Sequence, residues 1–238
     1  MPHFPFQRLQ ADLAALIAKS APGSRLPSEP DLAADLGVSR ATLREAMRTF
    51  EAQGLIRRRQ GAGTYVVGQP PVMESGLEVL ESMLTLARRT SLDVSPGEVV
   101  VTQIQADEAY AATLNVAPAT NLVRVARIMR AASRPVAYLV DTLPEEILHA
   151  EELATKFSGS VLDYLIQRGD PLTVSRTDIT ATNATAEVAK MLEIQRGDVL
   201  LYFSARLFTA SGKVVDYSHS YFVPGYFKFH IVRRVESS

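Results

Sequence analysis

The chain of 238 residues is 47% hydrophobic with a formal net charge of −1, so it can supply a real core and is long enough for two ordinary domains. It has no cysteine, which excludes disulfides and thiolate metal sites, and it shows neither a membrane-length apolar run nor the order of a signal peptide, so we expect a cytoplasmic protein. Residues 1–68 hold nine Lys/Arg and six Asp/Glu (+3), against sixteen and twenty (−4) in the remainder, so the N-terminal part is the better polyanion binder.

Two helices are predicted at the start of the chain. Leucines and Ile17 recur at helical spacing between Phe6 and Lys19, and the following segment, APGSRLPSEP, is rich in helix breakers. Ser28 can cap a second helix, with Pro30 in its first turn, where the missing N–H does no harm. Gly37 should end that helix.

A third helix is predicted from Ser39 to Gly54. Ser39 is a suitable N-cap, and Leu43, Ala46, Met47 and Phe50 form one apolar face. The opposite face carries Arg40, Thr42, Arg44 and Arg48. Such a face is either solvated or placed in a DNA major groove. Because a tight turn separates it from the second helix, the pair forms a helix-turn-helix, which favours the groove.

Two strand-like runs follow the third helix. Residues 55–59 and 64–67 are joined by a glycine-rich loop from Gln60 to Gly63, which predicts a β-hairpin or wing. Gly61 allows the backbone to approach phosphates closely, while Arg58 and Arg59 add positive potential.

The segment LPSEPDLAADLGVSRATLREAMRTFEAQGLIRRRQGAGTYV resembles the winged helix-turn-helix of the GntR family of bacterial transcription regulators almost throughout. The resemblance implies that Arg40 and Arg44 read base edges. It also implies phosphate contacts or a place at the wing tip for five others: Ser28, Ser39, Thr42, Gln60 and Gly61. Pro30 departs from the family, which usually has arginine there, so one common DNA contact is expected to be missing.

A linker is predicted at residues 69–75, because Pro70 and Pro71 favour extended backbone. It separates a DNA-binding domain (1–68) from a second domain (76–238). The second domain is expected to begin with a helix from Gly76 to Arg89, in which leucines recur at helical spacing.

The second domain contains an internal repeat at a separation of about 78 to 80 residues. Residues 110–116 and 188–194 each predict a short helix, residues 122–129 and 200–208 a first strand, and residues 136–144 and 214–224 a return strand. Two such helix-hairpin units would form one antiparallel sheet flanked by helices, so the fold class is α+β.

Residues 76–235 resemble the UTRA effector domain of the HutC-like branch of the GntR family, which has a chorismate-lyase-like fold. The resemblance implies a pocket for a sugar phosphate, a carboxylate or another polar metabolite. The effector-binding residues it suggests are Ser82, Arg127, Arg130, Ser160, Tyr164, Asp216 and Phe222. Met129 stands where the family has a second arginine, with Arg130 following on the other side of the strand. A strongly anionic effector therefore loses an anchor.

Simpler roles exist for several of these residues. Arg127 could be a surface or interface residue, Ser160 could only cap a helix from Val161 to Gln167, and Asp216 could pair with an arginine of the sheet. Tyr164 and Phe222 could be core or dimer-contact aromatics. The four histidines show no ligand spacing, so neither a metal site nor a cofactor is expected.

The favoured function is a ligand-responsive regulator, a homodimer that binds a two-fold double-stranded DNA operator as a repressor and is released by its metabolite. One alternative is a DNA-binding dimer without an effector. A second is a lyase-like enzyme fused to a DNA-binding head. No nucleophile, base and orienting group occur together in recognisable form, so we do not expect an enzyme.

Overall fold

The computed structural model describes residues 4–52, 54–59, 62–67, 73–89 and 94–232. The chain divides into two compact units, Met1–Val72 and Met73–Ser238, and each is described by itself.

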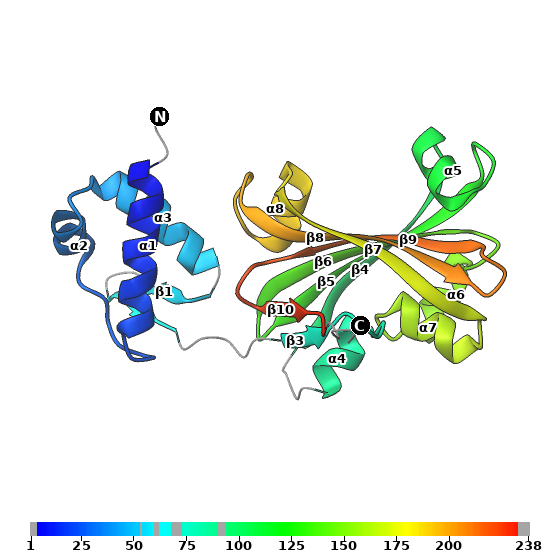
Figure 1. Cartoon of the computed structure of the whole chain (residues 1–238), viewed down its shortest axis with the longest axis horizontal. Helices are drawn as coiled ribbons and strands as arrows, with labels where there is room; N and C mark the ends of the chain where they lie inside the picture. Colours follow the sequence, from blue (N-terminus) through cyan, green and yellow to red (C-terminus); the bar gives the residue numbers. More distant parts are fainter. Residues whose placement is uncertain (1–3, 53, 60–61, 68–72, 90–93, 233–238) are drawn as a thin grey trace, which may run out of the picture. The chain divides into compact units, whose positions relative to one another are not determined.

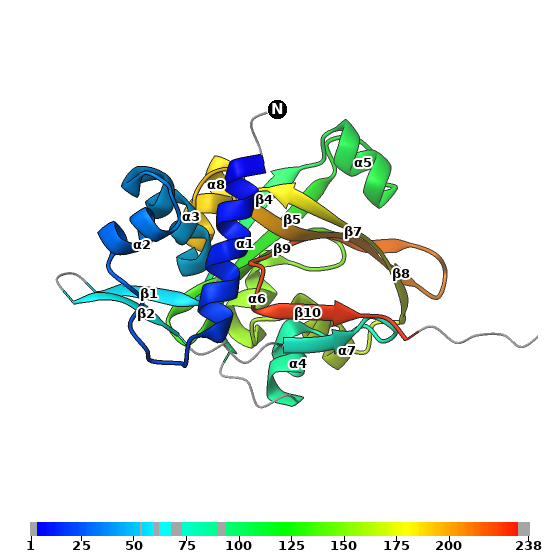
Figure 2. The same cartoon turned by 60° about the vertical axis from the view of Figure 1, so that its left-hand side comes forward.

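The first unit is a winged helix-turn-helix, as predicted. Its elements are α1 (Phe4–Lys19), α2 (Glu29–Asp35), α3 (Arg40–Ala52), β1 (Ile56–Arg59) and β2 (Gly63–Val66). β1 and β2 pair in antiparallel fashion (Figure 2). Ser28 caps α2, because its side chain accepts a hydrogen bond from the backbone N–H of Asp31. The Ser39 hydroxyl accepts from the N–H of Thr42 at 3.1 Å, and Gly37, at φ +64°, forms the turn between the two helices.

One apolar cluster holds the first unit together. The predicted inner face of α3 is buried, with Leu43 and Ala46 fully enclosed. Leucines and an isoleucine from α1 pack against it, together with Ile56 and Val66 from the wing. Because this cluster fixes the rotation of α3 about its axis, the arginines on the opposite side of the helix face solvent.

The second unit is built on a six-stranded antiparallel sheet in the order β4-β5-β6-β9-β8-β7. Its strands are β4 (Val94–Gln105), β5 (Asn121–Ala131), β6 (Arg134–Pro144), β7 (Leu172–Asn183), β8 (Val199–Thr209) and β9 (Val214–Phe222). Helices α5 (Glu108–Leu114) and α8 (Ala186–Leu192) lie on one side of the sheet, and α4 (Met83–Arg89), α6 (Ala150–Lys156) and α7 (Val161–Arg168) on the other (Figure 1).

The predicted internal repeat is confirmed. The first half is β4-α5-β5-β6 and the second is β7-α8-β8-β9, so the sheet order is the same when read outward from the β6–β9 seam. The two helices end alike, at Asn115 and Glu193, which both have positive φ. The strand register shifts after Met129 in one half and after Leu207 in the other, a separation of 207 − 129 = 78 residues.

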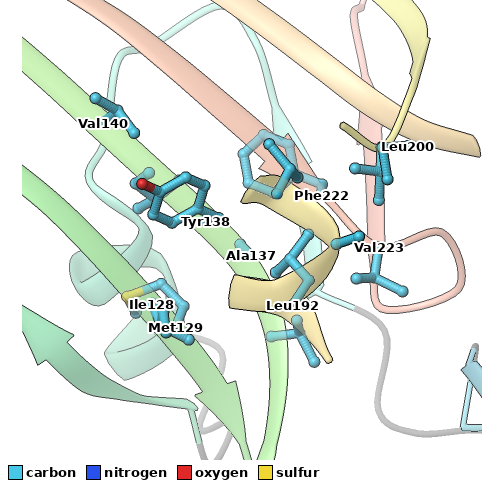
Figure 3. Close-up of a cluster of buried hydrophobic side chains, with 14 of the residues drawn as sticks. Ile128, Met129, Ala137, Tyr138, Val140, Leu192, Leu200, Phe222 and Val223 are labelled. Atoms are coloured by element: carbon cyan, nitrogen blue, oxygen red, sulfur yellow. The ribbon is translucent and has the colours of Figure 1, made fainter. Parts of the chain in front are cut away.

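The largest core cluster of the second unit joins the seam strands to α8. Leu192 of α8 packs among side chains of β5 and β6, with Phe222 and Val223 at the end of β9 (Figure 3). A second cluster lies under α6 and α7, where Leu143 and Leu165 are fully buried. The sheet is therefore anchored on both faces, and its strand β6 is almost wholly enclosed.

The predicted helix from Gly76 to Arg89 is wrong in its first half. Residues 73–76 form β3 (Met73–Gly76), which pairs in parallel with β10 (Phe227–His230), and α4 begins only at Met83. Leu77 and Leu80, which were expected on the buried face, are exposed. Residues 73–75 thus belong to a strand of the second unit and not to a linker, while 69–72 lie outside the described residues.

Candidate DNA-binding surface and effector site

The exposed face of α3 presents the predicted DNA-contacting side chains. Arg40 and Arg44 are exposed at the N-terminal end of the helix. Ser39 and Thr42 lie beside them, with their hydroxyl oxygens 2.8 Å apart. Ser28 is exposed at the N-terminus of α2. Helix ends with free donors and short hydroxyl side chains suit phosphate oxygens.

A pocket of about 350 Å³ lies between α2, α3 and the wing. Its lining includes the arginines Arg25, Arg44, Arg58 and Arg59 and one carboxylate, Glu29. Arg59 is exposed and stands over the Tyr65 ring at 5.1 Å. Arg58 was expected to be an unpaired cation on the wing, but it lies close to two carboxylates. Its Nη1 lies 3.8 Å from Glu29 and its Nε 3.7 Å from Glu51. Gln60 and Gly61, the predicted wing tip, lie outside the described residues.

The predicted effector residues Arg127 and Asp216 lie in one buried polar cluster, together with Asp141, which sequence reasoning missed. Arg127 of β5 is only 5% exposed. It donates through Nη2 to Asp141 of β6 and faces the Phe157 ring at 5.8 Å. Its Nε and Nη1 have no hydrogen-bond partner among the described residues. The backbone N–H of Thr142 donates to Asp216 at 3.2 Å.

The two buried carboxyl groups of this cluster, Asp141 and Asp216, affect each other's ionisation. Burial, together with the neighbouring Asp141 charge, raises the pKa of Asp216 well above its usual value. Burial also raises the pKa of Asp141, against the opposing effect of the Arg127 guanidinium. A proton shared by this pair is therefore bound preferentially at Asp216, which lies within hydrogen-bond distance of Asp141, the partner of Arg127.

Ser82 and Ser160 meet at a second polar cluster, which is centred on Asp163 of α7. The Ser82 hydroxyl donates to Asp163 at 2.6 Å, and the backbone N–H of Asp163 donates to Ser160 Oγ at 3.1 Å. Arg88 lies 3.5 Å from the same carboxylate. Ser160 thus caps α7, as the simpler reading supposed, and Ser82 ties α4 to α7.

The remaining predicted effector residues lie elsewhere. Tyr164 donates to Glu152 at 2.6 Å and stacks with Arg168. Arg130 donates to the Ser133 carbonyl in the hairpin turn and to Glu193. Phe222 packs among Phe203, Phe227 and Phe229. The structure therefore joins Arg127 to Asp216 and Ser82 to Ser160, but it does not gather all seven residues into one cluster.

Asp141 and Asp163 were not singled out from the sequence, although each has a recognisable sequence context. Asp141 is a lone charge inside the apolar run VAYLVDTLP, which is unusual for a central strand. Asp163 follows Ser160 by three residues, the spacing of a helix cap.

In the part of the chain that the structure describes, no three His, Asp or Glu side chains form a group that could hold a metal ion. No described helix is long and apolar enough to cross a membrane.

Comparison with known proteins matches both units. Residues 97–228, more than half of the chain, match the model of the UTRA domain, and residues 6–66 match that of bacterial regulatory proteins of the gntR family. The chain is 29% identical over 203 residues to the HTH-type transcriptional repressor NagR of Bacillus subtilis, covering 84% of this chain and 81% of that protein. It is 25% identical over 243 residues to the mannosyl-D-glycerate transport/metabolism system repressor MngR of Escherichia coli, covering 100% of both.

Among solved structures, PhnF from Mycobacterium smegmatis matches with a TM-score of 0.65 at 20% identity, over 96% of this chain and 100% of that chain. This match and the two domain matches confirm the fold class that the sequence predicted.

Removing Arg127 should destabilise the second unit. Arg127→Ala leaves the buried Asp141 charge without its partner, so we expect a loss of about 3–5 kcal/mol in the free energy of unfolding. The double variant Arg127→Met, Asp141→Leu removes both charges and should recover most of that loss. Urea unfolding can be followed by tyrosine fluorescence, because seven of the eight tyrosines lie in the second unit. Equal losses in the single and double variants would contradict the buried pair.

The stability of the second unit should depend on Asp216. Its raised pKa means that the folded state binds a proton more tightly than the unfolded state, so this contribution is full below the ordinary aspartate pKa of about 4 and declines as pH rises. In Asp216→Asn the amide can donate to Asp141 at every pH. We expect the variant to gain stability relative to wild type as pH rises from 5 to 8, measured by urea unfolding. A constant difference between the two proteins would show that Asp216 is ionised in the fold.

Proposed function

The chain belongs to the GntR family of bacterial regulatory proteins and carries a UTRA domain, and from this we propose that it is a repressor of the HutC-like branch, released from its operator by a small polar metabolite. It is a DNA-binding, ligand-responsive transcription regulator and not an enzyme. The observation that carries the proposal is the geometry of α3. Its apolar face is buried in the first unit, while Arg40 and Arg44 are exposed at its capped end.

The DNA-binding mode follows from that geometry. The recognition helix of a helix-turn-helix enters the major groove with its N-terminal residues at the base edges. Arg40 and Arg44 stand at that end, and arginine matches the O6 and N7 acceptors of guanine. The Ser28, Ser39 and Thr42 hydroxyls would contact the flanking phosphates, with Arg59 on the wing adding a further cation.

We further propose that the protein acts as a homodimer in the cytoplasm. One recognition helix covers only a short half-site, whereas two helices related by a two-fold axis read an inverted repeat and combine their affinities. The N-terminal charge balance of +3 is small for an isolated DNA-binding head, so a paired arrangement suits the proposed operator better.

The effector is proposed to bind near the Arg127 and Asp163 clusters. Arg127 is already matched by Asp141, and Met129 replaces a second arginine, so a doubly charged phosphate would meet little uncompensated positive charge. Hydroxyl groups suit the two carboxyl clusters better, because they can both donate and accept. The relative MngR is named for mannosyl-D-glycerate, a sugar derivative with one carboxylate. We therefore favour a sugar-derived effector with low charge.

The α3 arginines should supply sequence discrimination. Arg40→Ala and Arg44→Ala should each lose about 1–3 kcal/mol of operator binding, with a smaller effect on unrelated duplexes. Arg59→Ala should weaken all duplexes alike and reduce the salt slope by about one unit. The measurement is fluorescence anisotropy at several salt concentrations, with a duplex enriched by the wild type from a random library. Unchanged discrimination in both helix variants would refute this placement of α3.

The ligand response should be detectable without knowledge of the pathway. In a thermal-shift screen of sugars, sugar acids and sugar phosphates, an effector at 100 times its dissociation constant adds about 2.7 kcal/mol of stability. The same compound should then weaken binding of the enriched duplex. Asp216→Asn should keep DNA binding but lower the affinity for the compound. A ligand that tightened DNA binding would indicate a corepressor, and a screen without any stabilising compound would favour a second unit that serves only for dimerisation.

A further inference from the structure

A carboxylate lies among the arginines of the proposed DNA-binding surface. The Glu29 side chain is 19% exposed and lines the pocket between α2, α3 and the wing. Arg44 Nε donates to Glu29 Oε2 at 2.6 Å, and Arg58 Nη1 lies 3.8 Å from Oε1. Because DNA is a polyanion, a carboxylate at this place opposes binding unless it serves another purpose.

The contacts of Glu29 converge on Arg44. Arg58, the second cation of the group, donates through Nη2 to the Arg44 carbonyl at 3.4 Å. Glu51 of α3 holds Arg58 from the other side, accepting from its backbone N–H at 3.3 Å. The side chain of Arg44 and its backbone are thus both contacted by a group that spans α2, α3 and β1.

We propose that Glu29 is a positioning residue, which fixes the guanidinium of Arg44 for base recognition and so contributes to operator discrimination. This inference rests on the proposed function of α3. In this role Glu29 contacts no base itself and acts only through Arg44.

The chemistry of guanine recognition explains why such a brace is useful. A guanidinium must present two donors in one plane to O6 and N7. The Arg44 side chain is long and 53% exposed, so without a brace it samples many rotamers in free protein. The hydrogen bond from Nε to Glu29 restricts the plane of the group and does not use its two Nη atoms. Side chains locked by neighbouring hydrogen bonds recognise ligands more precisely than mobile ones.

Glu29 could instead be a favourable acid in the first turn of α2, where a negative charge suits the helix N-terminus. The two roles predict opposite results. If Glu29 matters only as a charge, its removal relieves repulsion and tightens binding to every duplex by the same factor. If it positions Arg44, its removal lowers the ratio of specific to unrelated binding.

The test compares two alanine variants of α2 that lose the same charge. Glu29→Ala and the control Asp35→Ala, whose side chain is exposed in the same helix, are titrated with the duplex enriched by the wild type and with a scrambled duplex. We expect Glu29→Ala to lose about tenfold in the ratio of the two affinities, and Asp35→Ala to keep the wild-type ratio.

A double-mutant cycle identifies the route of the effect. In an Arg44→Ala background, Glu29→Ala should cause no further loss of discrimination, because the side chain that it positions is gone. The inference is overturned if Glu29→Ala keeps the wild-type ratio, or if its loss is undiminished without Arg44. Should Glu29→Ala unfold at the assay temperature, Glu29→Met provides the same comparison, because it keeps the side-chain length but has no oxygen to accept from Arg44 Nε.

Failure of the proposed function gives a different pattern. If α3 does not read bases, Arg40→Ala and Arg44→Ala themselves keep the wild-type ratio, whatever Glu29→Ala does. If Arg44→Ala loses discrimination and Glu29→Ala does not, the proposed function stands and only the positioning role falls.

Discussion

Each unit of the chain contains an arginine paired with a carboxylate that is largely shielded from water. Charges removed from water are costly unless an opposite charge and good hydrogen bonds compensate them. In the second unit this requirement ties β5 to β6 through Arg127 and Asp141, at the centre of the sheet. In the first unit it ties α2 to α3 and β1 through Glu29. The same interaction connects two core strands in one unit and the elements around the exposed arginines of α3 in the other.

The difference between the two pairs lies in exposure. The Arg127 side chain is 6% exposed and that of Arg44 is 53% exposed. A solvated arginine can exchange bound water for a base edge while it keeps its hydrogen bond to the carboxylate. The ion pair therefore orients the side chain and leaves its other donors for the base. Arg127 has two donors that no described residue satisfies, but the Phe157 ring covers its guanidinium. A ligand that contacted Arg127 would therefore have to enter a closed core, so the proposed effector binding there requires local opening.

Local features of the sequence predicted local structure well. Ser28 and Ser39 were recognisable as caps because the N-cap rule depends on a few adjacent residues, and the inner face of α3 followed from its period. The helix expected from Gly76 failed because β3 pairs with β10, which is about 150 residues distant in sequence, and no local pattern encodes such a partner. The buried cluster around Arg127, where we propose that the effector binds, was only half predictable for the same reason. The motif identified Arg127, but its partner Asp141 becomes apparent only when β5 and β6 are placed in register.

The internal repeat allows the two halves of the second unit to be compared position by position. Val140 and His219 are cross-strand partners at the β6–β9 seam, 219 − 140 = 79 residues apart, so the pseudo-two-fold axis of the sheet passes between them. Two identical halves would place an equivalent polar cluster on each side of that axis. The β8 residue 78 positions after Arg127, the separation of the register shifts in β5 and β8, is Ala205, which cannot bind an anion or pair with an acid. The second half thus supplies Asp216 to the first half's cluster and has no arginine of its own there. The buried cluster of Arg127, Asp141 and Asp216 therefore has no counterpart at the equivalent β8 position of the second half, so the two halves share strand order and register but differ in their buried charges.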